Sequence, residues 1–332
     1  MKAKKFVLKQ QFVGFPKYSD VEIMEEELPP VTDGEFLAEA VFISIDPFIR
    51  IHPQEVGNVV MGQQVARILE SKSEHYAVGN YIVGFFGWRT HTISTPQLIT
   101  PDHRLPEYLI KDMDDLPLSL PLGILGMPGN TAYFGFLDIC KPKEGETVVV
   151  SGAAGTVGSH VGQIAKIKGC KVIGIVGSES KGKWITEELG FNYYINYKNQ
   201  NLKEELIKCA PEGIDCYFDN IGGDLSSTII STMKRFGRIS VCGFISQYNL
   251  ESGFDKAPAL QGYFVSNCLQ MQGYSALLFV PRWHEGIAQN LKWIKEKKLK
   301  YRETIIEGFE NTFQAFLDLL SGKNIGKTIV KV

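Results

Sequence analysis

The amino-acid sequence predicts an α/β fold in which a doubly wound parallel sheet is joined to a separate all-β domain. Three patterns in the 332 residues predict it: a strand–turn–helix–strand unit at 146–181, alternating strands and helices from 126 to about 294, and short strands broken by Pro and Gly before residue 123. A chain of this length has room for two domains, each with its own core.

The strand–turn–helix unit has the order that a dinucleotide needs. The β-branched run Thr147–Val150 is followed directly by Ser151–Gly158. Glycine at 155 lets backbone N–H groups approach a pyrophosphate, and glycine at 158 lets the helix lie close to the strand. Because Ala153 replaces the first glycine of the usual three, the motif alone is moderately specific. The sequence predicts a pyrophosphate at the N-terminus of this helix, bound by Gly155, Thr156, Val157 and Gly158.

The end of the second strand indicates which dinucleotide is bound. NAD-binding units normally end this strand with an acid that bonds the ribose 2′-hydroxyl. Here Lys171–Val176 ends without one, and Gly177-Ser178-Glu179-Ser180-Lys181 follows. A hydroxyl and a lysine favour a 2′-phosphate through charge-assisted hydrogen bonds, so NADP(H) is the expected cofactor and Lys181 a ligand. The alternative is that Glu179 is the missing acid, displaced by two positions, and that Lys181 begins a solvated helix.

The remaining elements follow the same two patterns. Further strands are expected at Glu35–Ile45, Gln64–Glu70, Tyr81–Phe86, Ile214–Phe218, Arg238–Cys242 and Lys327–Val332. Further helices are expected at Ser226–Phe236, Glu285–Lys298 and Asn311–Leu320. We therefore expect a β-domain at 1–125, completed by 300–332, around a nucleotide-binding domain at 126–299.

Composition excludes several classes of protein. The net charge is −2 with no charged tail, so neither nucleic acid nor an anionic membrane is an expected partner. No apolar run approaches 18 residues, and Phe6-Val7-Leu8 is interrupted by Lys9, which leaves no signal peptide. The six cysteines and six histidines lack metal-ligand spacing. We expect a soluble, cytoplasmic protein with reduced thiols and no metal site.

Four long segments then resemble one family. They are Met61–Ala66, Gly126–Gly135, Asp215–Gly223 and Ile305–Asn311, and together they are similar to the prostaglandin reductases, zinc-free members of the medium-chain dehydrogenases/reductases. The resemblance covers essentially the whole chain. It implies a GroES-like β-domain, a Rossmann domain and a homodimer. Zinc-dependent relatives carry Gly-His-Glu where this chain has Met61-Gly62-Gln63-Gln64, so no metal is implied.

The resemblance also implies an activity and a set of ligands. The activity is NADPH-dependent reduction of the carbon–carbon double bond of enals, enones and 15-oxoprostaglandins, together with oxidation of the 12-hydroxyl of leukotriene B4. Beyond the helix N-terminus, the implied cofactor contacts are Lys181, Tyr197, Asn220, Cys242, Gly243, Phe244, Ile245, Ser246, Tyr248, Tyr274, Ser275, Ala276 and Asn324. From the residues alone, Tyr197 would be an ordinary strand tyrosine and Asn324 a turn residue after Gly322.

Tyr248 is the candidate catalytic residue. When hydride reaches the β-carbon of an enone, negative charge develops on the carbonyl oxygen, and a fixed hydroxyl there lowers the barrier. A phenol donates that hydrogen bond without ionising at neutral pH, since its reference pKa is about 10. Two alternatives stay open: Tyr248 only packs on a ring, or the cofactor ribose hydroxyl is the donor. Arg50 is a second polar candidate, with a structural role as its alternative.

The sequence departs from the family in two places that should border the substrate. The loop between Arg50 and Met61 is about two residues shorter than usual, and Leu250–Pro258 replaces a proline-rich stretch. The substrate could therefore be a small alkenal or an oxidised lipid rather than a prostaglandin. Two other functions remain: a zinc-free quinone reductase, and a non-catalytic scaffold or lens-type protein.

Overall fold

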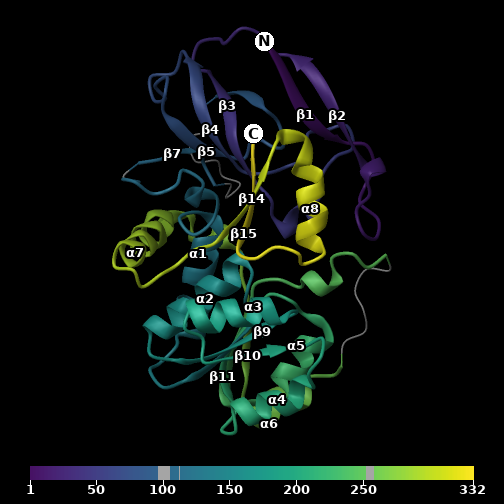
Figure 1. Ribbon diagram of the computed structural model, residues 1–332, viewed down its shortest axis with the longest axis vertical. Coiled ribbons are helices and arrows are strands. Elements are labelled where there is room, and N and C mark those ends of the chain that lie inside the picture. Colours follow the sequence, from purple (N-terminus) through teal and green to yellow (C-terminus); the bar gives the residue numbers. More distant parts are fainter. Residues whose placement is uncertain (96–104, 112, 252–257) are drawn as a thin grey trace. The chain divides into compact units, whose positions relative to one another are not determined.

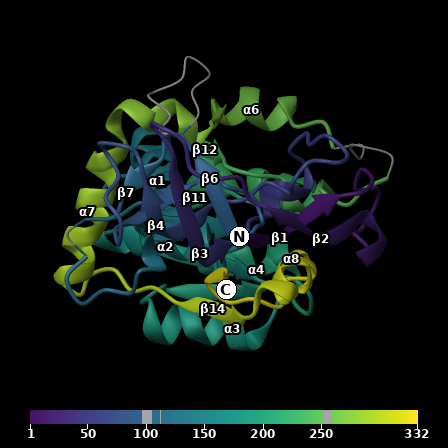
Figure 2. The same cartoon turned by 90° about the horizontal axis from the view of Figure 1, so that it is seen from above.

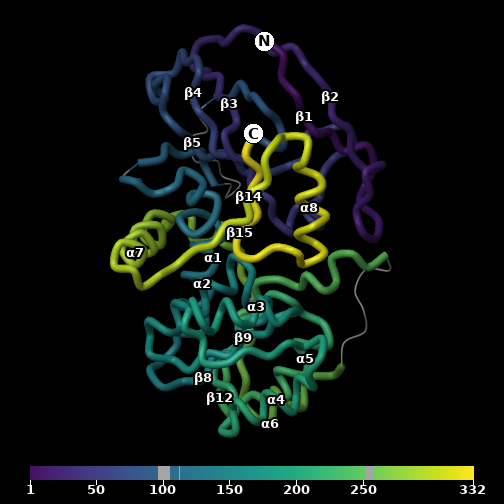
Figure 3. The backbone as a smooth tube through the Cα atoms, in the orientation of Figure 1, coloured from purple at the N-terminus to yellow at the C-terminus, as the bar shows by residue number. Residues whose placement is uncertain are grey.

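The computed structural model describes residues 1–95, 105–111, 113–251 and 258–332, and these form two compact units. We call Met1–Gly123 with Glu303–Val332 the β unit, and Ile124–Arg302 the α/β unit. The borders expected from the sequence, after residues 125 and 299, differ from these by two and three residues. Figures 1 and 3 show that the purple N-terminal and yellow C-terminal parts of the chain both belong to the β unit.

The α/β unit contains a six-stranded, wholly parallel sheet with the order β10-β9-β8-β11-β12-β13. The chain starts at the central strand, runs to one edge and then fills the other half, as the doubly wound prediction requires. The strands are β8 (Thr147–Ser151), β9 (Lys171–Val176), β10 (Tyr193–Asn196), β11 (Ile214–Asp219), β12 (Met233–Val241) and β13 (Gln270–Gly273). The direction changes between β8 and β11, which is where such folds bind their ligands.

Helices cover this sheet because its central strands are apolar on both faces. Every residue of β8 and β11 is buried, as a parallel sheet between two helical layers requires. The helices are α1 (Met127–Phe134), α2 (Thr156–Ile167), α3 (Glu179–Lys183), α4 (Leu202–Cys209), α5 (Gly223–Ile230), α6 (Gln261–Asn267) and α7 (Trp283–Lys295). None of those within the described residues is both long and apolar enough to cross a bilayer.

The helix predicted at Ser226–Phe236 is wrong in its second half. Helix α5 ends at Ile230, where the hydroxyls of Ser231 and Thr232 donate to the backbone carbonyls of Thr228 and Ile229. Strand β12 begins at Met233, three residues before the expected helix end, because Met233 pairs with Ile214 of β11. Pairing with a strand that is distant in sequence overrides the local helical pattern.

The β unit contains a seven-stranded sheet and a two-stranded ribbon. The sheet has the order β14-β15-β3-β4-β5-β7, with β6 also paired to β3, and β1 pairs with β2 in the ribbon. The strands are β1 (Lys2–Leu8), β2 (Val21–Glu27), β3 (Phe36–Ser44), β4 (Gln64–Ser71), β5 (Tyr81–Gly84), β6 (His91–Ser94), β7 (Tyr108–Leu109), β14 (Glu303–Glu307) and β15 (Lys327–Lys331).

One helix from the C-terminal segment completes the core of this unit. Helix α8 (Thr312–Leu320) lies beside β1 and β2 in the two views of Figures 1 and 2. Its Phe313 and Phe316 are fully buried against Phe6, Leu8 and other apolar side chains of the N-terminal strands. The apolar face predicted for 311–320 is therefore the face that α8 buries.

A buried histidine in α2 gives the α/β unit a pH-dependent stability. Burial lowers the pKa of His160 from 6.5 to about 4, although the nearby backbone of Thr156 acts in the opposite direction. Above pH 6.5 the ring is neutral in both the folded and the unfolded chain. Between pH 6.5 and 4 only the unfolded chain takes up the proton, so stability falls across this window.

We expect His160→Val to remove this loss. The variant should match the parent at pH 7.5 within about 1 kcal/mol, and should be about 2 kcal/mol more stable to unfolding at pH 4.5. Urea denaturation at both pH values measures the difference. His75→Gln, which changes an exposed histidine, is the matched control. A His160→Val advantage that does not grow on acidification would contradict the assignment.

Candidate cofactor and active site

The turn between β8 and α2 is built around close backbone contacts. A Cβ on Gly158 would lie 2.4 Å from the carbonyl oxygen of Gly152, and one on Gly155 would lie 3.3 Å from the same atom. Gly152 itself has a φ of +60°, a left-handed conformation that favours glycine. Gly155 is the N-cap of α2 and provides no capping side chain. The first turn of α2, which includes Thr156, Val157 and Gly158, therefore presents its N–H groups as a cradle for a pyrophosphate.

A buried carboxylate fixes the neighbouring turn at the end of β11. Asp219 is 3% exposed, and its oxygens accept five hydrogen bonds. The donors are the hydroxyls of Ser151, Tyr217 and Ser226 and the backbone N–H groups of Ile221 and Gly222, at 2.6–3.1 Å. A carboxylate with this many donors is well compensated for its burial. Asp219 thus determines the backbone path that leaves the sheet at Asn220.

Asn220 is held from the side of β8. Its backbone N–H donates to the hydroxyl of Ser151 at 2.9 Å, and its side-chain amide donates to the carbonyl of Ser151 at 2.7 Å. Gly222 and Gly223 then follow with φ of +71° and +63°. A Cβ on Gly222 would lie 3.0 Å from Cβ of Phe244, so the second turn also depends on glycine.

The loop after β12 is hydrogen-bonded to the turn after β11. The N–H groups of Cys242 and Gly243 donate to the carbonyl of Asp219 at 2.8 and 3.1 Å. Ile245 and Ser246 donate from their N–H groups to Asn220 and Ile221 at 3.3 and 3.1 Å, and the Ser246 hydroxyl donates to Ile221 at 2.6 Å. The structure therefore brings the predicted residues Asn220 and 242–246 together at one edge of the sheet.

Tyr248 lies over the same loop. Its ring meets that of Phe244 edge-to-face at a centroid distance of 4.9 Å, and a Cβ on Gly243 would lie 3.3 Å from its hydroxyl oxygen. Burial raises the pKa of Tyr248 to about 12, the charge of Cys242 adds to the rise, and a hydrogen bond from the Phe244 backbone opposes it. That bond is accepted by the phenol oxygen, so the O–H proton remains for donation. Within the described residues the hydroxyl donates to no acceptor.

Tyr274 follows β13 and is fixed more rigidly. Its hydroxyl donates to the carbonyl of Thr131 at 2.7 Å, and burial raises its pKa well above the usual value. A Cβ on Gly135 would lie 2.0 Å from that oxygen, so Gly135 is needed for the position of the ring. Burial also raises the pKa of the Cys242 thiol to about 11, and this thiol hydrogen-bonds Tyr274. The other two residues predicted here follow directly. Ser275 is the N-cap of a 3₁₀ helix at 276–282, and Ala276 is the first residue of that helix.

The ends of β9 and β10 bear on the two interpretations of Glu179. Its carboxylate accepts hydrogen bonds from Tyr194, Asn196 and Asn199 at 2.6, 3.0 and 3.4 Å, and these donors hold its pKa below the usual value. These donors hold the carboxylate towards β10, and whether Glu179 also replaces the ribose-binding acid stays open at this point. Lys181 is half-buried, and burial followed by the charge of Lys198 lowers its pKa.

Tyr197 lies next to this lysine-bearing turn. It leaves β10 where its N–H donates to Val176, the last residue of β9, at 3.2 Å. A Cβ on Gly177 would lie 3.4 Å from the Tyr197 ring, and the ring itself is 45% exposed. The alternative of an ordinary half-buried strand tyrosine does not describe this side chain, because Tyr197 follows the strand and is available to a ligand.

Two candidates belong to the β unit. Asn324 donates from its side-chain amide to the carbonyl of Gly326 at 3.0 Å, a contact typical of a turn residue. Arg50 donates from Nε and Nη2 to the carbonyl of Gly14 at 3.2 and 2.8 Å, which supports its structural alternative.

The short loop after Arg50 is closed by Gln54, whose side-chain oxygen accepts from the N–H of Met61 at 2.7 Å. Of Leu250–Pro258, residues 252–257 lie outside the described residues.

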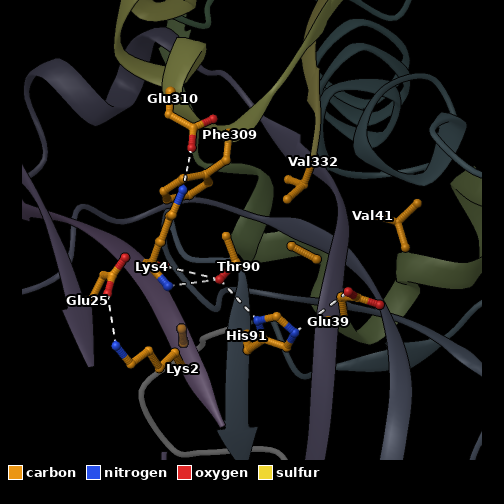
Figure 4. Close-up of a pocket in the computed structure, with 12 residues that line it drawn as sticks. Lys2, Lys4, Glu25, Glu39, Val41, Thr90, His91, Phe309, Glu310 and Val332 are labelled. Atoms are coloured by element: carbon orange, nitrogen blue, oxygen red, sulfur yellow. Dashed lines mark hydrogen bonds and ion pairs between the residues drawn. The ribbon is translucent and has the colours of Figure 1, made fainter. Parts of the chain in front are cut away.

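The β unit also has a cavity of about 480 Å³, shown in Figure 4, that is a weaker candidate. Its cations are paired with carboxylates of the same wall: Lys4 with Glu310 at 2.7 Å and Lys2 with Glu25 at 3.8 Å. His91 lies 3.7 Å from Glu39, and burial lowers its pKa. Both lysines are thus paired, and none of the predicted site residues lines this cavity.

No group of three or more His, Cys, Asp or Glu residues in the described part of the chain has the geometry of a metal site. The six cysteines are all free thiols. The absence of a metal therefore stays a prediction from the spacing of the cysteines and histidines. Measuring the zinc content of the purified protein would test it.

Comparison with known proteins matches both units. A family model described as the N-terminal domain of oxidoreductase matches residues 4–101, and one described as zinc-binding dehydrogenase matches 156–280. Prostaglandin reductase 1 of Bos taurus is 48% identical over 99% of this chain and 99% of its own length. The chain belongs to the prostaglandin reductase family.

Other members of this wider group are also similar over their full length. The NADP⁺-dependent 2-alkenal reductase of Nicotiana tabacum is 36% identical over 99% of this chain and 97% of its own length. The crystal structure of CurA from Vibrio vulnificus in complex with NADPH superimposes with a TM-score of 0.91, at 34% identity, over 99% of both chains. The fold class and the family predicted from the sequence are confirmed.

Sequence reasoning missed the residues that position the site. Asp219 was noted only as part of a motif, and Ser151 only as part of the glycine turn. A signal was available for Asp219, because it is an acid that directly follows the apolar run Cys216–Phe218 and precedes a turn, which predicts a residue that bonds that turn. Lys198 had no local signal, since its relation to Lys181 depends on the pairing of β9 with β10.

Proposed function

We propose that this protein reduces the carbon–carbon double bond of α,β-unsaturated carbonyl compounds. The similarity to prostaglandin reductase 1 and to a 2-alkenal reductase supports this reaction, and the similarity to an NADPH complex supports the cofactor. The protein is an NADP(H)-dependent oxidoreductase acting on C=C bonds. The observation that carries its chemistry is the protonated, buried phenol of Tyr248 beside the loop after β12.

NADPH, when bound, supplies the hydride that adds to the β-carbon of the substrate. The pyrophosphate would be held by the cradle at Gly155–Gly158, and the nicotinamide half by the loop 242–248. Tyr248 donates its O–H hydrogen bond to the substrate carbonyl oxygen, where the electron pair of the double bond arrives. The enolate would then take a proton from water at the α-carbon, so that one hydride and one proton together saturate the double bond. With its pKa near 12, Tyr248 stays a hydrogen-bond donor at every pH at which the protein would work.

The 2′-phosphate of NADPH would lie at the ends of β9 and β10. Lys181 and Tyr197 provide an ammonium and a hydroxyl there, while Glu179 is occupied by its three donors. A carboxylate facing the ribose would repel a 2′-phosphate, and this one faces β10 instead. This arrangement supports NADPH over NADH.

Lys181→Ala is expected to raise the KM for NADPH by one to two orders of magnitude and to leave the KM for NADH nearly unchanged. Loss of one charged phosphate contact costs about 1.5 to 3 kcal/mol. Steady-state kinetics with both cofactors is the measurement, and Lys183→Ala removes an exposed lysine of the same helix as a control. Equal effects of Lys181→Ala on both cofactors would place the phosphate elsewhere.

A substrate panel tests the reaction class. We expect NADPH oxidation with alkenals, with enones and with 15-oxoprostaglandins, and slower oxidation with quinones. The reverse assay, NADP⁺ with leukotriene B4, tests oxidation of its 12-hydroxyl. Turnover of quinones alone would support the zinc-free quinone reductase, and turnover of nothing in the panel would support a scaffold role.

We further propose a cytoplasmic homodimer. Six free thiols suit a reducing compartment. Strand β13 is an edge strand whose four residues are all exposed and include no charge and no proline, so nothing prevents it from pairing with another strand. Exposed Val265, Met271 and Leu278 lie on or next to it in the sequence. Light scattering should give a molecular mass of twice that of one chain. Met271→Lys, which puts a charge on this edge strand, should lower the measured mass.

A further inference from the structure

Two lysines from different elements come close at the edge of the α/β sheet. Lys181 belongs to α3, and Lys198 follows β10. The parallel register of Asn196 with Val176 brings the residues after both strands to the same edge. The charge of Lys198 is one of the two causes that lower the pKa of Lys181. A like charge nearby disfavours the charged form of an ammonium group, and an anion bound beside both lysines would favour it.

Gly177 provides the room for this arrangement. A Cβ at this position would lie 3.3 Å from Cε of Lys198 and 3.4 Å from the ring of Tyr197. Among the described residues, no carboxylate lies within ion-pair distance of the Lys198 ammonium. The end of the Lys198 side chain and the Tyr197 ring therefore both lie against Gly177, the first residue of the turn that leads to Lys181. The geometry gathers two cations and a phenol around one small, solvent-accessible position.

We propose that Lys198 is a second cationic contact for the 2′-phosphate and a determinant of cofactor specificity. The inference rests on the position of the phosphate proposed above. A phosphate monoester carries close to two negative charges at neutral pH, which one lysine neutralises only in part. Lys181 and Lys198 together match that charge, and a free ribose hydroxyl gains nothing from either. Gly177 acts indirectly, because a larger residue there would displace Lys198.

Calorimetric titration with 2′,5′-ADP and with 5′-AMP tests Lys198 without any turnover. Lys198→Gln should weaken 2′,5′-ADP by about tenfold and 5′-AMP by less than about twofold. Lys198→Arg, which keeps the charge, should stay within about threefold of the parent for both ligands. Lys183→Gln, which removes one exposed positive charge from α3, should change neither.

Unchanged affinity of Lys198→Gln for 2′,5′-ADP would overturn the proposal, as would equal weakening of both ligands. An equal loss in Lys183→Gln would do the same, because it would indicate net charge rather than contact. A loss in Lys198→Arg as large as in Lys198→Gln would show that the charge is not what binds. The substrate panel can fail while this selective loss is observed, so the two proposals are tested separately.

Discussion

Tyr248→Phe is expected to lower kcat for an enone by about 10², equivalent to about 2.7 kcal/mol of transition-state stabilisation, while the dissociation constant for NADPH stays nearly unchanged. The phenol oxygen already accepts a hydrogen bond from the backbone of Phe244, and no acceptor in the described part of the chain takes its proton. The donor is therefore used mainly when charge develops on the carbonyl oxygen. Single-turnover kinetics of NADPH oxidation measures the step directly.

Tyr248→Ala is the informative companion variant. The edge-to-face contact of the Tyr248 and Phe244 rings survives in Tyr248→Phe and is lost in Tyr248→Ala. If the residue only packs, the Phe variant keeps its kcat and the Ala variant loses activity. Full kcat in Tyr248→Phe, with chemistry rate-limiting, would leave the ribose hydroxyl of the cofactor as the donor.

Asp219→Asn is expected to destabilise the α/β unit by about 3 kcal/mol and to weaken NADPH binding by more than tenfold. The substitution removes the charge and converts one of the two acceptor oxygens into an NH₂ group. At Oδ1 this group would face the N–H donors of Ile221 and Gly222, and at Oδ2 it would take the place of the acceptor of the Ser226 hydroxyl. The turn that carries Asn220 and supports Cys242 and Gly243 would shift with it. Urea denaturation and cofactor titration measure the two effects.

Asp215→Asn separates stability from binding. Asp215 is the second residue of the same strand, is buried, and bonds Lys234 at 2.9 Å and the N–H of Thr147 at 2.8 Å. It lies at the strand end opposite Asp219. We expect a loss of stability from this substitution without a change in the NADPH dissociation constant. Comparable weakening of NADPH binding in both variants would mean that Asp219 acts only through global stability.

The fold and the site could be predicted from the sequence wherever the pattern involves only neighbouring residues. The glycine turn at 151–158 and the β-branched strands around it predict the binding edge because each step follows from neighbouring residues. The bond between Asp219 and Ser151 and the nearness of Lys198 to Lys181 were not predictable, since both depend on which strands pair. The prediction of a helix as far as Phe236 was wrong for the same reason, because Met233 pairs with Ile214, which is distant in sequence, and so belongs to the sheet.

The discontinuity of the β unit has a consequence for biosynthesis. Strand β15 pairs with β3, and Phe313 and Phe316 fill the core beside β1, so the first 123 residues have an incomplete sheet and an open core until the last thirty are made. The α/β unit, 124–302, is continuous and is complete before then. On the ribosome, the unit encoded second can therefore fold first. Meanwhile the N-terminal segment must be protected from aggregation until residues 303–332 leave the exit tunnel.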